Sequence, residues 1–151
     1  MSVLKKSLDV AQWKEEVRML TEKAAPFVQK LNEAANIGTM EALAFAARDL
    51  AIAKCHFGDF GKQIRNLPKC SDNVAQKART ALLEAFKIYH IAVFFGTNLM
   101  QTITRVAAAH QDGEKITTKE EKDLIILRST MAKNIAEAQN KWQIFISWYY
   151  A

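Results

Sequence analysis

Apolar residues recur at alternating spacings of three and four along most of the chain. In its first part this stripe continues for four heptads, through Val10, Trp13, Val17, Leu20, Ala24, Phe27, Leu31 and Ala34. An unbroken stripe of this kind is typical of a helix packed along a bundle seam. It predicts a first helix over about residues 7–35. Pro26 lies inside this range and removes one backbone hydrogen bond, so we expect a kink near Glu22.

A second helix is predicted over about residues 39–66. The segment Asn36-Ile37-Gly38 predicts the end of the first helix, and Thr39 is the predicted N-cap of the second. Apolar residues then follow at seven-residue intervals, at Leu43, Leu50, Phe57 and Ile64. Leu67-Pro68 ends the helix, because the residue before a proline is disfavoured in the helical region.

A third helix is predicted to begin at a Ser71 cap and to continue to about Ala109. Its stripe comprises Ala75, Ala78, Leu82, Ala85, Tyr89, Ala92, Gly96, Leu99, Ile103 and Val106. A straight helix over residues 72–109 is about 57 Å long, against about 42 Å for each of the first two. Either Gly96-Thr97-Asn98 bends or breaks this helix, or one of its ends projects beyond the others.

The last helix is predicted to open at a capping box formed by Thr118 and Glu121. Its stripe comprises Leu124, Leu127, Met131, Ile135, Ala138, Trp142, Phe145 and Tyr149. Four long helices joined by short turns predict an all-α fold, a single-domain antiparallel four-helix bundle over residues 1–151.

The antiparallel order predicts which parts of neighbouring helices lie at the same level. Counting from the turns places residues 88–95, which are almost entirely apolar, opposite residues 44–51 and residues 133–138. Both of these segments are rich in alanine, and large side chains against small ones fill a core well. We therefore expect residues 88–95 to form the centre of the core.

Composition agrees with a folded helical protein. Half of the 151 residues are hydrophobic and a quarter are charged, which excludes a disordered chain, and seven Gly and Pro are too few for a turn-rich all-β fold. The net charge of +5 permits an anionic partner. Cys55 and Cys70 form no disulfide framework, and no secretory signal is visible, so free thiols in the cytoplasm are the expectation.

One end of the predicted bundle combines basic and aromatic residues. Residues 142–151 carry no charged side chain, and three of their apolar residues, Trp142, Phe145 and Tyr149, are expected to pack into the core against small residues. Basic residues flank the turn at the same end. This combination suits a partner surface or a membrane interface. The predicted contact residues are Trp148, Tyr149, Tyr150, Ile144, Ile146, Lys62, Arg65 and Lys69.

Two hypotheses follow from this end of the bundle. The first is a non-enzymatic interaction or structural protein that docks onto a second copy of itself or onto another protein. The second is a membrane-active bundle that binds anionic lipid, by association or by pore formation. No catalytic residue, cofactor or metal site is predicted, since none of His56, His90 and His110 has a glutamate three residues before it, as ferritin-type sites require.

A third hypothesis rests on a six-residue match. Arg105-Val106-Ala107-Ala108-Ala109-His110 resembles the Arg-x4-His motif of the HEPN ribonuclease families, which are also small helical bundles. The resemblance implies RNA binding or cleavage at a dimer cleft, with Arg105 and His110 at the reaction centre. Val106 departs from the polar residue that those families usually have after the arginine.

Overall fold

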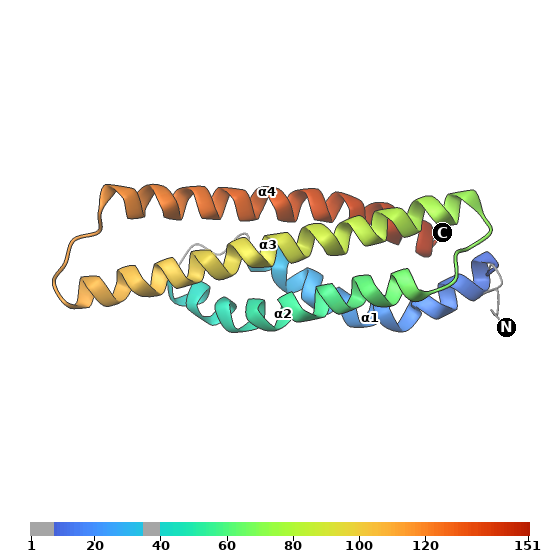
Figure 1. The fold of residues 1–151 in the computed structure, drawn as a ribbon, viewed down its shortest axis with the longest axis horizontal. Coiled ribbons are helices and arrows are strands. Elements are labelled where there is room, and N and C mark those ends of the chain that lie inside the picture. Colours follow the sequence, from blue (N-terminus) through green and yellow to red (C-terminus); the bar gives the residue numbers. More distant parts are fainter. Residues whose placement is uncertain (1–7, 35–39) are drawn as a thin grey trace.

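The computed structural model describes residues 8–34 and 40–151. These contain four helices, α1 (Val10–Ala34), α2 (Met40–Asn66), α3 (Asn73–Gln111) and α4 (Thr118–Tyr149). They alternate in direction, so that the start of α1, the α2–α3 connection and the C-terminus lie at one end (Figure 1). The predicted antiparallel helical bundle is confirmed. The stop at Asn36-Ile37-Gly38 and the cap at Thr39 lie outside the described residues.

The predicted apolar stripes form the core. All ten positions of the α3 stripe are buried, and in α4 the stripe from Met131 to Phe145 is buried as well. The side chain of Leu43 lies outside the described part of the chain, but Leu50, Phe57 and Ile64 of α2 are buried. The α3 helix packs most extensively, against α4 and then α2, whereas α1 makes the fewest contacts.

Aromatic rings connect all four helices across this core. Successive ring centroids lie 5.9–6.4 Å apart, within the range of favourable aromatic pairs. The series closes on α1, where it began. Its members are Phe27 of α1, Phe57 of α2, Phe86 of α3, Trp142 and Phe145 of α4, and Trp13 of α1.

The α3 helix continues through Gly96 without a break, so the expected bend is not needed to explain its length. A Cβ atom at Gly96 would lie 3.1 Å from Sδ of Met131 and 3.2 Å from Cδ1 of Leu50. The glycine therefore lets α2 and α4 approach α3 closely. The extra length of α3 projects instead: with α4 it forms a two-helix tip that extends beyond the α1–α2 end (Figure 1).

The register between α3 and α4 agrees with the prediction, but the register between α2 and α3 does not. Phe57 stacks on Tyr89 with centroids 5.3 Å apart, so the apolar run of α3 lies opposite residues near Phe57 and not opposite residues 44–51. The connection explains the shift. Leu8 forms a β-bridge with Cys70, donating to the Lys69 carbonyl oxygen and accepting from the Ser71 amide, both at 3.0 Å. This extended segment makes α3 begin farther along the bundle axis.

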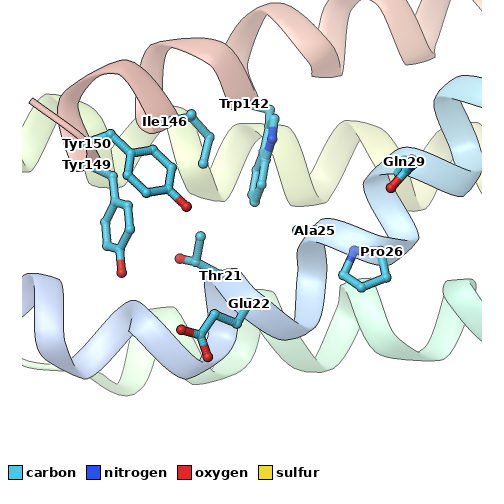
Figure 2. Close-up of a pocket in the computed structure, with 9 residues that line it drawn as sticks. All are labelled: Thr21, Glu22, Ala25, Pro26, Gln29, Trp142, Ile146, Tyr149 and Tyr150. Atoms are coloured by element: carbon cyan, nitrogen blue, oxygen red, sulfur yellow. The ribbon is translucent and has the colours of Figure 1, made fainter.

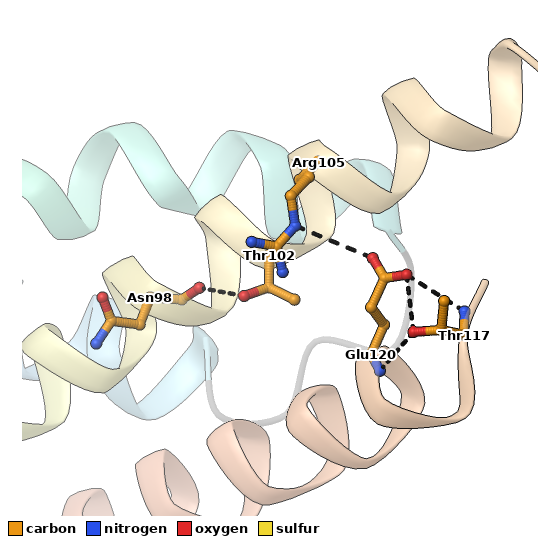
Figure 3. Close-up of polar contacts among 5 residues, drawn as sticks. All are labelled: Asn98, Thr102, Arg105, Thr117 and Glu120. Carbon is orange, nitrogen blue, oxygen red and sulfur yellow. Dashed lines mark hydrogen bonds and ion pairs between the residues drawn. The ribbon is translucent and has the colours of Figure 1, made fainter. Parts of the chain in front are cut away.

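The predicted N-caps of α3 and α4 are each wrong by one residue. The cap of α3 is Asp72, whose carboxylate accepts a hydrogen bond from the Ala75 amide at 2.9 Å. The capping box of α4 is Thr117 with Glu120. The Glu120 carboxylate also forms an ion pair of 4.0 Å with Arg105 of α3 (Figure 3).

The capping box yields a test with a matched control. Replacing Thr117 by alanine leaves the Glu120 amide without its acceptor, which lies at 3.1 Å, and is expected to lower the free energy of unfolding by about 1 kcal/mol. Thr118→Ala, one residue later, removes the cap predicted from the sequence and is expected to change stability by less than about 0.5 kcal/mol. Urea denaturation followed by circular dichroism measures both, and equal effects would contradict the assignment.

Candidate functional site

Trp148, predicted to contact a partner, is half-buried and packs within the chain. Its ring meets Trp13 of α1 edge-on at 5.6 Å. Nζ of Lys14 lies 4.8 Å from the centre of the same ring, and Lys14 also donates to the carbonyl oxygen of Ala151 at 3.4 Å. Trp148 therefore holds the end of α4 onto α1.

The other predicted aromatic and apolar residues divide into two groups. Ile146 is half-buried against the core, and Tyr149 is half-buried with its ring on Phe145 at 5.6 Å. Partial burial raises the pKa of the Tyr149 phenol, and Tyr150 and Glu22 add smaller contributions. Ile144 and Tyr150 are exposed, by 53% and 75%.

A groove separates α1 from the C-terminal part of α4. Figure 2 shows that α1 changes direction around Ala25 and Pro26, about one turn after the kink predicted near Glu22, and that side chains of α4 point across the opening towards α1. The groove has a volume of about 500 Å³ and an aromatic wall on the α4 side. Its lining consists of Thr21, Glu22, Ala25, Pro26, Gln29, Trp142, Ile146, Tyr149 and Tyr150.

The three predicted basic residues do not join this groove. Lys62 and Arg65 line a different groove, between α2 and α3, which shares no lining residue with the first. Lys69 is exposed in the α2–α3 connection, where its carbonyl oxygen accepts the hydrogen bond from Leu8. The predicted basic and aromatic residues thus lie at one end of the bundle but on separate surfaces.

The groove between α2 and α3 has an apolar floor and a basic rim. Its volume is about 390 Å³. Lys62 and Arg65 form the α2 rim and Lys87 lies on the α3 rim, and all three are exposed. The described lining residues include no carboxylate. The full lining is Phe57, Gly58, Gly61, Lys62, Arg65, Leu83, Phe86, Lys87, His90 and Ile91.

Two glycines of α2 keep this groove open. A Cβ atom at Gly58 would lie 3.8 Å from the His90 ring, and one at Gly61 would lie 3.5 Å from the Arg65 guanidinium, both ordinary contacts. Each glycine costs about 1 kcal/mol of helix stability relative to alanine. Unlike Gly96, neither glycine is required by close packing, so these positions leave space that larger side chains would fill. The sequence analysis did not single out this groove, although Gly58, Gly61 and the two basic α2 residues are spaced by three and four.

The outer face of α4 carries a second feature that the sequence analysis missed. Ile126 and Ile144 are exposed by 61% and 53% and are eighteen residues apart, which is five helical turns. Lys133 and Glu137 lie between them on the same side of the helix, each seven residues from the nearer isoleucine, and both are exposed.

Perturbed ionisable groups do not gather into a catalytic centre in the part of the chain that the structure describes. Burial raises the pKa of the Tyr89 phenol above its ordinary value, and the nearby Asn32 side chain partly offsets the rise. The hydrogen bond of Lys141 to Glu84, at 2.9 Å, raises the pKa of that ammonium group. Tyr89 belongs to the core, and the lysine joins α4 to α3.

The Arg-x4-His segment lies in the projecting tip. Arg105 forms its ion pair with Glu120, which gives it a partner on α4 (Figure 3), and His110 is exposed near the end of α3. Among the side chains that the structure describes, no three from histidine, cysteine or acidic residues are grouped to hold a metal ion. Within the residues that the structure places, every helix falls short of the length and apolarity that crossing a membrane requires.

No protein-family model, curated protein or solved structure matches the chain.

Two aromatic residues at the C-terminal end, Trp148 of α4 and its C-cap residue Tyr150, differ in a testable way. Trp148→Ala removes ring contacts with Trp13 and Phe145 and is expected to lower the free energy of unfolding by about 2 kcal/mol. Tyr150→Ala removes a mostly exposed ring and should cost less than about 0.5 kcal/mol. Chemical denaturation compares the two, and an unaffected stability for Trp148→Ala would overturn the structural role assigned to this ring.

Proposed function

We propose that the chain is a non-enzymatic interaction protein that self-associates through the outer face of α4. The observation that carries this proposal is the spacing of four exposed residues on one side of the helix. From Ile126 the intervals are seven, four and seven residues to Ile144, with Lys133 and Glu137 between. These intervals read the same in both directions along the helix.

This spacing makes the face complementary to itself. When two copies of α4 lie antiparallel around a twofold axis at the level of Ile135, Ile126 of one copy faces Ile144 of the other. Lys133 then faces Glu137 of the second copy, and the symmetry forms each contact twice. The contact extends over about 27 Å of helix. Apolar ends with opposite charges between them supply both burial and register.

The site agrees with an interaction role in other respects. Phe145 and Trp148 at the end of α4 pack against Trp13 of α1, whereas Ile144 and Tyr150 remain exposed. The membrane and RNA hypotheses stay predictions.

The charge pair provides a rescue experiment. Lys133→Glu alone, or Glu137→Lys alone, places like charges opposite each other twice per dimer and is expected to weaken the dimer about tenfold. The double variant restores opposite charges and should return the dissociation constant to within about threefold of the parent. Sedimentation equilibrium measures all four proteins, and failure of the double variant to recover would overturn the antiparallel arrangement.

Removing the apolar ends tests the same interface without changing charge. Ile126→Ser with Ile144→Ser should leave a folded monomer, because both side chains are mainly exposed in the single chain. Ile125→Ser is the matched control: its side chain is 66% exposed but points about 100° away around the helix, so it should not change the mass. A parent protein that is monomeric at every concentration would refute self-association. Truncation after Ser147 is a poorer test, since it also removes Trp148 from its contact with Trp13.

A further inference from the structure

We propose that the groove between α2 and α3 binds a single-chain anionic amphiphile, such as a medium-chain fatty acid, with one ligand per protein chain. The groove is the one bordered by Lys62, Arg65 and Lys87. This binding activity does not depend on the proposed self-association, because the interface lies on α4 and the groove on α2 and α3.

The floor of the groove suits an alkyl chain. Leu83, Phe86 and Ile91 of α3 and Phe57 of α2 supply apolar surface, and the volume of about 390 Å³ falls within the usual range of small-molecule sites. Ile91 remains 37% exposed beside this opening, so a bound chain would cover apolar surface that now meets water.

The rim of the groove suits an anionic head group. Lys62 and Arg65 approach it from α2 and Lys87 from α3, so positive charge lines both sides. None of these three residues forms an ion pair with a carboxylate among the residues that the structure describes. A carboxylate head group can therefore gain charge-assisted hydrogen bonds without displacing an existing partner.

The shape of the groove favours an alkyl chain over a docked helix. The space comes from two missing side chains, at Gly58 and Gly61, which are three residues apart on one side of α2. The two glycines produce a slot that extends along about one turn of α2. A docked α-helix with its side chains is about 10–12 Å across and is too wide for a slot of this kind. Because both glycines weaken α2 without being needed for close packing, we assign the slot to a ligand of small cross-section.

Isothermal titration of the full chain with decanoate below its micelle concentration tests the proposal. We expect saturable binding at one site per chain, no binding of acetate, and binding of uncharged decanol at least about tenfold weaker. Lys62→Gln with Lys87→Gln should weaken decanoate binding about tenfold. Gly58→Leu should abolish it by filling the slot, while a Cβ atom there meets only an ordinary contact at 3.8 Å and leucine improves the helix propensity of α2.

Matched variants separate the groove from general charge and hydrophobicity. Lys115→Gln with Lys119→Gln removes the same charge at the projecting tip, and Ala25→Leu fills the groove between α1 and α4 instead. Both should bind decanoate as the parent does. Thermal unfolding followed by circular dichroism checks that each variant is folded. Gly61→Leu is a second slot-filling variant, to be used if Gly58→Leu does not fold.

Several outcomes would overturn the proposal. These are no decanoate binding by the parent, equal affinity for decanol, unchanged binding by both folded slot-filling variants, or binding only to anionic phospholipid vesicles and not to monomeric decanoate. Repeating the titration with the Ile126→Ser and Ile144→Ser variant keeps the two proposals distinct. Decanoate binding should persist in that monomer, and a parent that binds decanoate but never dimerises would refute self-association alone.

Discussion

The closed series of aromatic contacts is the constraint on which the rest of the structure depends. It joins α1 to α2 through Phe27 and Phe57, and α4 back to α1 through Phe145 and Trp13. Because α1 makes few other contacts with α3 and α4, these rings, with Trp148 beside them, fix where α1 lies. Between these two rings of α1, directly before Phe27, the helix bends at Pro26, and the groove of Figure 2 remains open there.

The helices and their buried faces were predictable because helical periodicity is a local property of the sequence. The α3–α4 register was predictable for a related reason, since a compact turn joins these helices and counting residues from it brings Gly96 to Met131. The α2–α3 register was not. It depends on an extended connection held by Leu8, a residue more than sixty positions away in sequence, and no count along the two helices contains that contact.

The candidate site was only partly predictable, because sharing an end of a bundle is not the same as sharing a surface. Topology alone places Arg65 and Tyr150 at the same end of the bundle. The direction in which each side chain leaves its helix differs, however, so the two residues line different grooves. The same difference in direction explains Ile144 and Ile146. Two residues apart, they point about 200° apart around α4, so one reaches the core and the other the solvent.

Glycine in a helix can serve different structural roles, and the atoms around each glycine indicate which role it has. At Gly96 a methyl group would meet two side chains at 3.1–3.2 Å, so the residue serves the packing of three helices. At Gly58 a methyl group would meet only ordinary contacts. Gly58 therefore lowers the stability of the helix as Gly96 does, but without allowing closer packing of neighbouring helices. A stability cost that packing does not explain is a physical reason to look for a function in the space beside it, and that space has an apolar floor and a basic rim.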